Sequence, residues 1–177
     1  MSVGTAQVDP VEVTGGDVIE LHDGTTVRVH PMDASDAPSL ERFHHMLSAE
    51  TRYFRFFTFH PWLSEEELHH FTHVDHTMRE AIVAAAGDEI VAVARFDRRK
   101  GLLEAEVAFV VVDGWQGLGL GTALFRRLAD RARAVGVRRL VADVLPHNRR
   151  MLAVFHHSGL SVHSETRDGV VHLVLDL

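Results

Sequence analysis

The chain has 177 residues, 46% of them hydrophobic and 24% charged, which suits one globular domain with its own core. It has no cysteine, which excludes disulfides, cysteine-ligated zinc and a thiol nucleophile. The formal charge of −7 argues against nucleic acid as a partner, because proteins that bind phosphate backbones carry a basic excess. No apolar run approaches the roughly 18 residues of a membrane span and no export signal is present, so we expect no membrane association and a cytoplasmic location.

Residues 1–16 show no sustained hydrophobic period, and we predict a flexible N-terminal arm there. No repeat, low-complexity tract or linker divides the remainder, so a single domain is expected over 17–177. The domain begins with a β-hairpin that turns at Asp23-Gly24. A helix capped by Ser35 or Asp36 follows, with an apolar stripe. The stripe consists of Leu40, Phe43, His44 and Leu47.

An aromatic cluster lies between positions 53 and 59. We assign it to the core because large apolar side chains are usually buried, and the alternative is a binding surface. Ser64 and Glu67 then form a capping box that opens a short helix. Four histidines follow, and His73 would share a helix face with His69 and also with His70. Their spacing does not match a zinc site, so no metal site is expected. These histidines are His69, His70, His73 and His76.

A hairpin over 81–96 and a strand over 102–112 form an antiparallel meander that leads to Gln116-Gly117-Leu118-Gly119-Leu120-Gly121. An amphipathic helix follows and ends at Gly136. The glycines allow close approach of a ligand, and the unpaired N–H groups of the helix point into the turn. This arrangement favours phosphate binding. The sequence of this turn matches neither the dinucleotide-binding motif nor the P-loop motif. The alternative to phosphate binding is a glycine-rich turn that binds no ligand.

The last third of the chain reads as a parallel strand over 138–145, a helix from Arg149 to His157 capped by Asn148, and a closing hairpin. Strands and helices thus alternate along this part of the chain. The whole pattern predicts an α/β (α+β) fold built on a mixed sheet.

The order Gln-x-x-Gly-x-Gly after a strand resembles the pyrophosphate-binding motif of the GNAT superfamily of N-acyltransferases. The similarity extends over roughly residues 25–175. It is tightest in four segments, where it resembles the acetyltransferase domain of bacterial protein lysine acetyltransferases that modify acyl-CoA synthetases. These segments are Arg52-Tyr-Phe-Arg-Phe-Phe, Phe71-Thr-His-Val-Asp-His, Ala105-Glu-Val-Ala-Phe-Val-Val and Asn148-Arg-Arg-Met-Leu.

The resemblance implies a GNAT-like mixed, mostly antiparallel sheet with a splayed parallel pair, flanked by helices. It implies acetyl-CoA as co-substrate and direct transfer of the acetyl group to a protein lysine, with an acyl-CoA synthetase as a candidate partner. Two other functions stay open. One is N-acetylation of a small amine or antibiotic, and the other is a non-catalytic acyl-CoA sensor.

A base must deprotonate the lysine ammonium, whose pKa in the free side chain is about 10.4. The position of Glu106 in Ala-Glu-Val-Ala-Phe matches the glutamate that serves as general base in lysine acetyltransferases of this superfamily. Glu104 lies on the same face of the strand and is the second candidate. The alternative for Glu106 is an exposed strand residue with no catalytic role.

The resemblance also assigns cofactor contacts. The backbone N–H of Val110, at an expected bulge, would donate to the oxyanion, and backbone groups of Val110, Val111 and Val112 would pair with pantetheine. Asn148 would cap its helix and bond the cofactor arm. Phe155 stands where many members have a tyrosine that protonates the leaving thiolate, so that acid is missing. The N–H groups of the turn would hold the pyrophosphate, from Gln116, Gly117, Leu118, Gly119, Leu120, Gly121 and Thr122.

Overall fold

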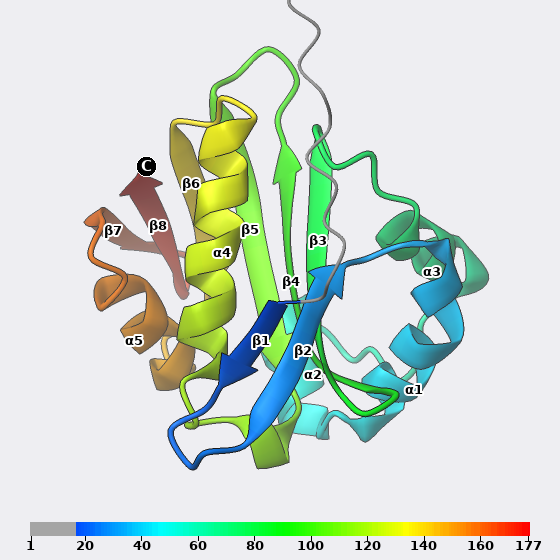
Figure 1. Cartoon of the computed structure of the whole chain (residues 1–177). Coiled ribbons are helices and arrows are strands. Elements are labelled where there is room, and N and C mark those ends of the chain that lie inside the picture. Colours follow the sequence, from blue (N-terminus) through cyan, green and yellow to red (C-terminus); the bar gives the residue numbers. More distant parts are fainter. Residues whose placement is uncertain (1–16) are drawn as a thin grey trace, which may run out of the picture.

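A computed structural model describes residues 17–177, which form one eight-stranded sheet with helices on both faces (Figure 1). The predicted N-terminal arm, 1–16, lies outside the described residues. The strands are β1 (Asp17–Glu20), β2 (Thr26–Pro31), β3 (Arg79–Ala86), β4 (Glu89–Arg98), β5 (Glu104–Val111), β6 (Arg139–Val144), β7 (Ser161–Arg167) and β8 (Val170–Asp176). The helices are α1 (Ala37–Met46), α2 (Ala49–Phe56), α3 (Glu65–Thr72), α4 (Leu120–Ala134) and α5 (Arg149–His156).

The sheet order is β1-β2-β3-β4-β5-β6-β8-β7, and every neighbouring pair is antiparallel except β5 and β6. These two strands pair only where Glu104–Glu106 faces Arg139–Val141. Beyond Glu106, β5 continues to Val111 with no partner on its β6 side. The predicted mixed sheet with one splayed parallel pair is therefore confirmed.

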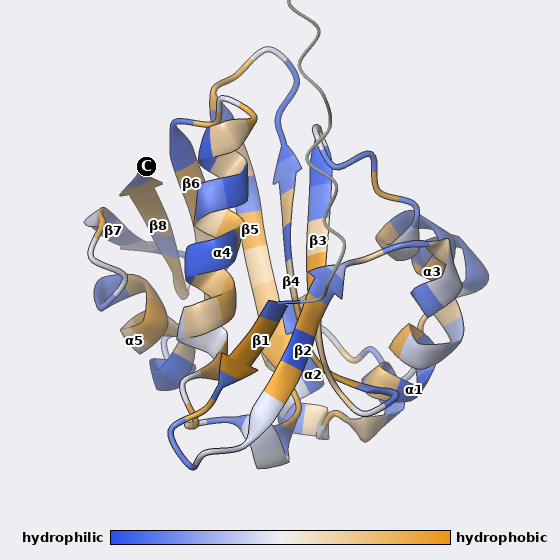
Figure 2. Ribbon diagram, viewed as in Figure 1, coloured by the Kyte–Doolittle hydropathy of each residue, from blue (hydrophilic) through white to orange (hydrophobic). Residues whose placement is uncertain are grey.

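Two apolar layers hold the helices to the sheet, because successive residues of a strand face opposite sides. On one face, α4 buries Leu124 and Leu128 against a cluster that includes Phe96 of β4. On the other face, α1 buries Phe43 against a cluster that includes Val93 of β4. Figure 2 shows the hydrophobic colour on the middle of β3 and β5 and hydrophilic stripes on the outer side of α4.

Local signals in the sequence correctly placed most element boundaries. The Asp23-Gly24 turn, the Ser64 and Glu67 capping box and the Asn148 cap are all present. The cap predicted for α1 is different, because the Asp36 side chain accepts a hydrogen bond from the Asp33 N–H and does not cap α1. Asp33 instead caps a short 3-10 turn that precedes α1.

The aromatic segment is the main correction to the predicted elements. Ser48 caps a helix that the sequence pattern did not reveal, and this helix, α2, carries Tyr53, Phe54 and Phe56. None of the five aromatic residues is fully buried and only Phe56 packs against a core cluster, so the assignment of the whole segment to the core was wrong. The reason is that α2 lies at the rim of the molecule, where its inner side faces a cleft.

Candidate active site

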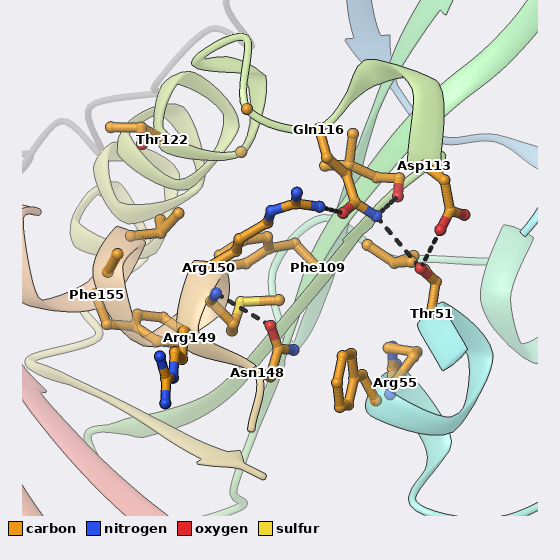
Figure 3. A pocket seen from close by; sticks show the side chains of 18 of the residues that line it. Thr51, Arg55, Phe109, Asp113, Gln116, Thr122, Asn148, Arg149, Arg150 and Phe155 are labelled. Carbon is orange, nitrogen blue, oxygen red and sulfur yellow. Dashed lines mark hydrogen bonds between the residues drawn. The ribbon is translucent and has the colours of Figure 1, made fainter. Parts of the chain in front are cut away.

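A cleft of about 630 Å³ opens where β5 and β6 diverge, and its size is typical of small-molecule sites. Its walls come from β5, the glycine turn (116–121), the first turn of α4, one side of α5, and α2 (Figure 3). Representative lining residues are Thr51, Phe109, Gly119, Thr122, Asn148 and Arg150. Elements distant in sequence thus meet at the point where the parallel pair separates.

The glycine turn gives the cleft an anion-binding floor. Gly119 precedes α4 with φ 90°, and no side chain caps the helix. Gly117 also has a positive φ, 79°. The first N–H groups of a fifteen-residue helix therefore face the cleft without a side-chain acceptor. Such an arrangement suits a phosphate group.

Gln116 joins three walls of the cleft through its side chain. Its amide nitrogen donates to the Val111 carbonyl at 2.9 Å and to the Thr51 hydroxyl at 3.3 Å. Its amide oxygen accepts from Arg150 at 2.6 Å (Figure 3). Gln116 thus links β5, α2 and α5 and fixes where the glycine turn starts.

Asp113 anchors α2 beside this turn. Its carboxylate accepts hydrogen bonds from the Ser48 N–H at 3.0 Å, the Ser48 hydroxyl at 2.7 Å and the Thr51 hydroxyl at 2.9 Å. Partial burial alone would raise the pKa of Asp113, but these hydrogen bonds outweigh it and lower the pKa below the ordinary value. Asp113 is therefore ionised at neutral pH and holds the start of α2.

The cleft gathers most of the residues that the sequence singled out. Lining it are Val110, Val111, Gln116, Gly117, Gly119, Gly121, Thr122, Asn148 and Phe155. Four others do not line it, namely Glu106, Val112, Leu118 and Leu120. Leu120 belongs to the core, with 1% of its surface exposed, whereas Glu106 is exposed on the strand just before the lining residues begin.

The expected bulge at Val110 is absent, which changes the direction of that residue's N–H. The register between β4 and β5 runs without a shift, and Val112 N–H donates to the Val91 carbonyl. Since hydrogen-bonded pairs in an antiparallel ladder recur at every second residue, the Val110 N–H also points to β4. The backbone N–H groups that point away from β4, on the side of the cleft, belong to Phe109 and Val111.

Glu106 lies opposite Asp97 across the β4–β5 pair. Like charges at directly opposed positions are destabilising, and Asp97 is neutralised by two hydrogen bonds from Arg95, at 3.0 and 3.2 Å. Glu104 lies 3.1 Å from Arg139. Within residues 17–177, Glu106 forms no ion pair and no side-chain hydrogen bond. Its carboxylate is therefore free to accept a proton or to bind a cation.

Arg55 extends from α2 into the cleft wall and is half-buried there. Burial lowers its pKa to about 10, and the nearby Arg95 adds to the decrease. Its guanidinium lies 5.0 Å from the centre of the Phe56 ring. The wall next to Glu106 therefore carries a positive charge as well as carboxylates.

Asn148 and Phe155 face the cleft from α5. The Asn148 side-chain oxygen accepts from the Met151 N–H at 3.2 Å, which leaves its NH₂ group available (Figure 3). Phe155 is 1% exposed and packs edge-on against Phe109 and Phe125. Asn148 can thus cap the helix and bind a ligand at once, while Phe155 contributes only an apolar surface.

Sequence reasoning missed lining residues on elements remote from the glycine turn, above all His22, Thr51, Phe54 and Arg150. His22 follows β1 and Thr51 lies on the unpredicted α2, 65 residues before Gln116, so no local pattern connects them to the site. Among these residues, Arg150 could have been predicted from the sequence. It lies in the first turn of the helix that Asn148 caps, and is therefore close to Asn148.

Two further classes of site find no support in the part of the chain that the structure describes. No three His, Asp or Glu side chains there come together in a way that would hold a metal ion. No helix there is both long and apolar enough to cross a membrane.

Comparisons with known proteins agree with this geometry. Residues 41–160 match the acetyltransferase (GNAT) family. An acetyltransferase of Pseudomonas aeruginosa is 30% identical over 138 residues, which are 76% of this chain and 74% of that protein. The GNAT domain of S. lividans PAT is 40% identical with a TM-score of 0.86, covering 92% of this chain and 97% of that chain.

A longer relative is also similar. The cAMP-binding acyltransferase from Mycobacterium smegmatis is 26% identical with a TM-score of 0.64. The match covers 91% of this chain but 47% of that one. Because the family match spans well over half of the sequence and the cleft has the expected floor, the protein belongs to the GNAT family and is an acetyl-CoA-dependent N-acetyltransferase.

Proposed function

We propose that the protein transfers the acetyl group of acetyl-CoA to lysine side chains of a protein acceptor, by direct attack of the lysine on the thioester. The observation that carries this proposal is the unpaired Glu106 carboxylate at the edge of a cleft of about 630 Å³. The 40% identity to the GNAT domain of S. lividans PAT, a protein acetyltransferase, supports a protein acceptor.

Glu106 acts as the general base in this proposal. A lysine ammonium must lose its proton as the amine reaches the thioester carbon, and a carboxylate without a fixed partner can take it directly or through one water. Asp97 cannot take this role as readily, because both of its oxygens accept hydrogen bonds from Arg95. The carboxylates of Asp97 and Glu106 together attract the cationic side chain to the edge of the cleft.

The cleft-facing edge of β5 holds the pantetheine arm and the reacting carbonyl. Phe109 and Val111 direct N–H groups toward the cleft, so one of these replaces Val110 as the donor to the oxyanion. Pantetheine pairs with this unpartnered edge as an added strand would. The NH₂ group of Asn148 donates to the same arm from the opposite wall.

The N–H groups of the glycine turn bind the pyrophosphate, at Gly117, Leu118, Gly119, Leu120, Gly121 and Thr122. The contact expected from the Gln116 N–H is not part of this proposal, because that group donates to the Asp113 carbonyl at 3.2 Å. No side chain protonates the leaving sulfur at Phe155. A thiol of pKa about 8.5 leaves as a thiolate with little assistance, so the reaction does not require that acid.

The aromatic segment favours a protein acceptor over a small amine. A small-amine site would be closed by that segment, yet within it only Phe54 and Arg55 line the cleft, whereas Tyr53 is 49% exposed and Phe59 is 83% exposed outside it. Most of the segment therefore does not cover the cleft, and a lysine on a protein surface can reach its rim.

The test is a transfer assay that compares acceptors. The protein is incubated with acetyl-CoA and either purified acyl-CoA synthetases or a panel of small amines, and the products are identified by mass spectrometry. We expect acetyl-lysine on a synthetase and little transfer to the amines. Efficient transfer to a small amine with none to proteins would contradict the protein acceptor.

The base is tested by Glu106→Gln, with Glu104→Gln as the matched control that removes one carboxylate from the same face. We expect Glu106→Gln to lower kcat about 100-fold or more at neutral pH with unchanged acetyl-CoA affinity. Glu104→Gln should retain most of the activity. Equal rates for the parent and Glu106→Gln across the pH range would end the assignment of Glu106 as the base.

A further inference from the structure

The turn between β1 and β2 lies against the glycine turn. His22 N–H donates to the Leu118 carbonyl at 3.1 Å. A Cβ added at Gly119 would lie 2.7 Å from Nε2 of the His22 ring, so this imidazole is in contact with Gly119. The ring also lines the cleft. Figure 1 shows the β1–β2 turn beside the loop that leads into α4.

Arg150 approaches the same turn from the opposite wall. Its guanidinium donates to the Gln116 side chain at 2.6 Å and spans from α5 to the start of the glycine turn (Figure 3). A guanidinium has five N–H groups, and no carboxylate among residues 17–177 pairs with that of Arg150. Its charge and its remaining N–H groups are therefore available to an anion in the cleft.

The charge balance shows why such groups are needed. A helix N-terminus supplies the equivalent of about half a positive charge, which is less than the charge of a diphosphate. The whole chain carries −7, so its overall field opposes the approach of an anion. Cationic side chains at the site itself must supply the difference.

We propose that His22 and Arg150 bind the phosphates of coenzyme A from two sides, above the floor formed by the glycine-turn amides. Arg150 gives a permanent charge and a forked donor, and His22 gives an imidazole donor. The β1–β2 hairpin is then part of the cofactor site and not only the edge of the sheet. This inference rests on the proposed placement of coenzyme A in the cleft.

The experiment measures the Kd of coenzyme A by calorimetry for His22→Ala, Arg150→Ala and the double variant, together with kcat at saturating acetyl-CoA. Matched controls are His156→Ala and Arg126→Ala, two exposed residues outside the cleft. We expect each cleft variant to raise Kd about tenfold, with kcat within twofold of the parent. The controls should stay within twofold in both quantities.

A second series separates phosphate binding from packing against Gly119. His22→Lys supplies an N–H donor without a ring, whereas His22→Phe supplies a ring without a donor. Affinity recovered by Lys and not by Phe supports phosphate binding, and affinity recovered by Phe would overturn it for His22. Unchanged Kd in both single variants and the double variant would overturn the inference while the parent still bound coenzyme A. A parent that does not bind coenzyme A would instead refute the proposed function.

Discussion

Gly119 shows how a single backbone conformation creates the anion site. Its φ of 90° is strained for any residue with a Cβ, and an added Cβ would also collide with the His22 ring. Gly117 has a similar φ of 79°, but an added Cβ there would meet nothing within 4 Å. A substitution at Gly117 therefore introduces backbone strain alone, whereas a substitution at Gly119 introduces strain and a steric contact with His22.

We predict that Gly119→Ala weakens acetyl-CoA binding more than Gly117→Ala does, because only the former moves the His22 ring. Strain of about 1–2 kcal/mol is expected at either position, with an additional loss at Gly119. The measurement is the Kd of acetyl-CoA by calorimetry. In a His22→Ala background the two alanine variants should cost the same, and an excess cost at Gly119 in that background would refute the contact.

Residues with local sequence signals were easier to group than residues that meet only in the folded chain. Gly119, Thr122 and Asn148 were expected at one site because a helix start and its cap are encoded locally, and all three line the cleft. Val110 was assigned to the oxyanion through a bulge that the β4–β5 register does not contain. His22 was not found, since its contact with Gly119 joins positions that only the folded chain brings together.

At the scale of elements, α2 depends on one carboxylate. Asp113 accepts from two groups of Ser48, the residue that caps α2, and from Thr51 in its first turn. We predict that Asp113→Ala lowers the free energy of unfolding by about 1–2 kcal/mol and raises the KM for acetyl-CoA, because α2 forms one wall of the cleft. Urea unfolding and steady-state kinetics measure the two effects.

Asp88→Ala is the control for Asp113→Ala, since it removes one exposed carboxylate from a turn. The folded-state pKa of Asp113 is lowered, so its stabilising effect is present above the ordinary carboxyl pKa and disappears as pH falls below it. The stability difference between Asp113→Ala and the parent should therefore shrink on acidification. A difference that persists at the lowest accessible pH would contradict this role.

The packing of α1 depends on a histidine that must stay neutral. His44 is 2% exposed, and its Nε2 lies 2.9 Å from the His60 carbonyl. Burial lowers the pKa of His44 below its ordinary value of 6.5. The folded state therefore resists a proton that the unfolded chain accepts, and stability is lost as pH falls below 6.5.

We predict that the melting temperature of the parent falls between pH 7 and pH 5, and that His44→Gln reduces this slope because glutamine does not titrate. His163→Gln, on an exposed strand position, should keep the slope of the parent. The measurement is thermal unfolding followed by circular dichroism at each pH. An unchanged slope in His44→Gln would show that another group controls the acid sensitivity.

Helices and turns that are specified by neighbouring residues in the sequence were predicted better than those that depend on distant contacts. Ser64 with Glu67 and Asp23 with Gly24 act within four residues, so both features were predicted correctly. The α2 helix was missed because its aromatic residues were interpreted as one cluster and the cap at Ser48 was not considered. Its cap, Ser48, becomes recognisable once Asp113 is known to bind it.

At the scale of the whole molecule, function depends on the separation of β5 from β6. The sequence predicted a parallel pair after a crossover helix, but it did not predict that β8 inserts between β6 and β7. Strand order depends on contacts between distant segments, which no local pattern specifies. The splay after Glu106 frees the edge of β5 for pantetheine and lets α4 and α5 start beside each other.

An ion pair with a buried carboxylate connects strand β3 to helix α4. Glu80 of β3 is 2% exposed, and its carboxylate accepts from Arg131 of α4 at 2.8 Å, with His76 at 2.8 Å on the other oxygen. Removing Arg131 would leave a buried carboxylate without its cation, which is costly even when some water enters.

We predict that Arg131→Ala lowers the free energy of unfolding by about 2–3 kcal/mol. Arg133→Ala, which removes an arginine paired with Asp130 on the exposed side of α4, should cost less than about 1 kcal/mol. Urea unfolding of the two variants gives the comparison. Equal small losses would mean that Glu80 finds another partner and that the pair does not hold α4 to the sheet.

The central claim is that the diphosphate of acetyl-CoA binds the main-chain amides of the glycine turn, with the thioester directed toward Glu106. The most direct measurement is a crystal structure of the protein with acetyl-CoA. It should show phosphate oxygens within hydrogen-bond distance of the N–H groups between Gly117 and Thr122, and pantetheine along the free edge of β5. Acetyl-CoA bound elsewhere, or a thioester remote from Glu106, would contradict the account.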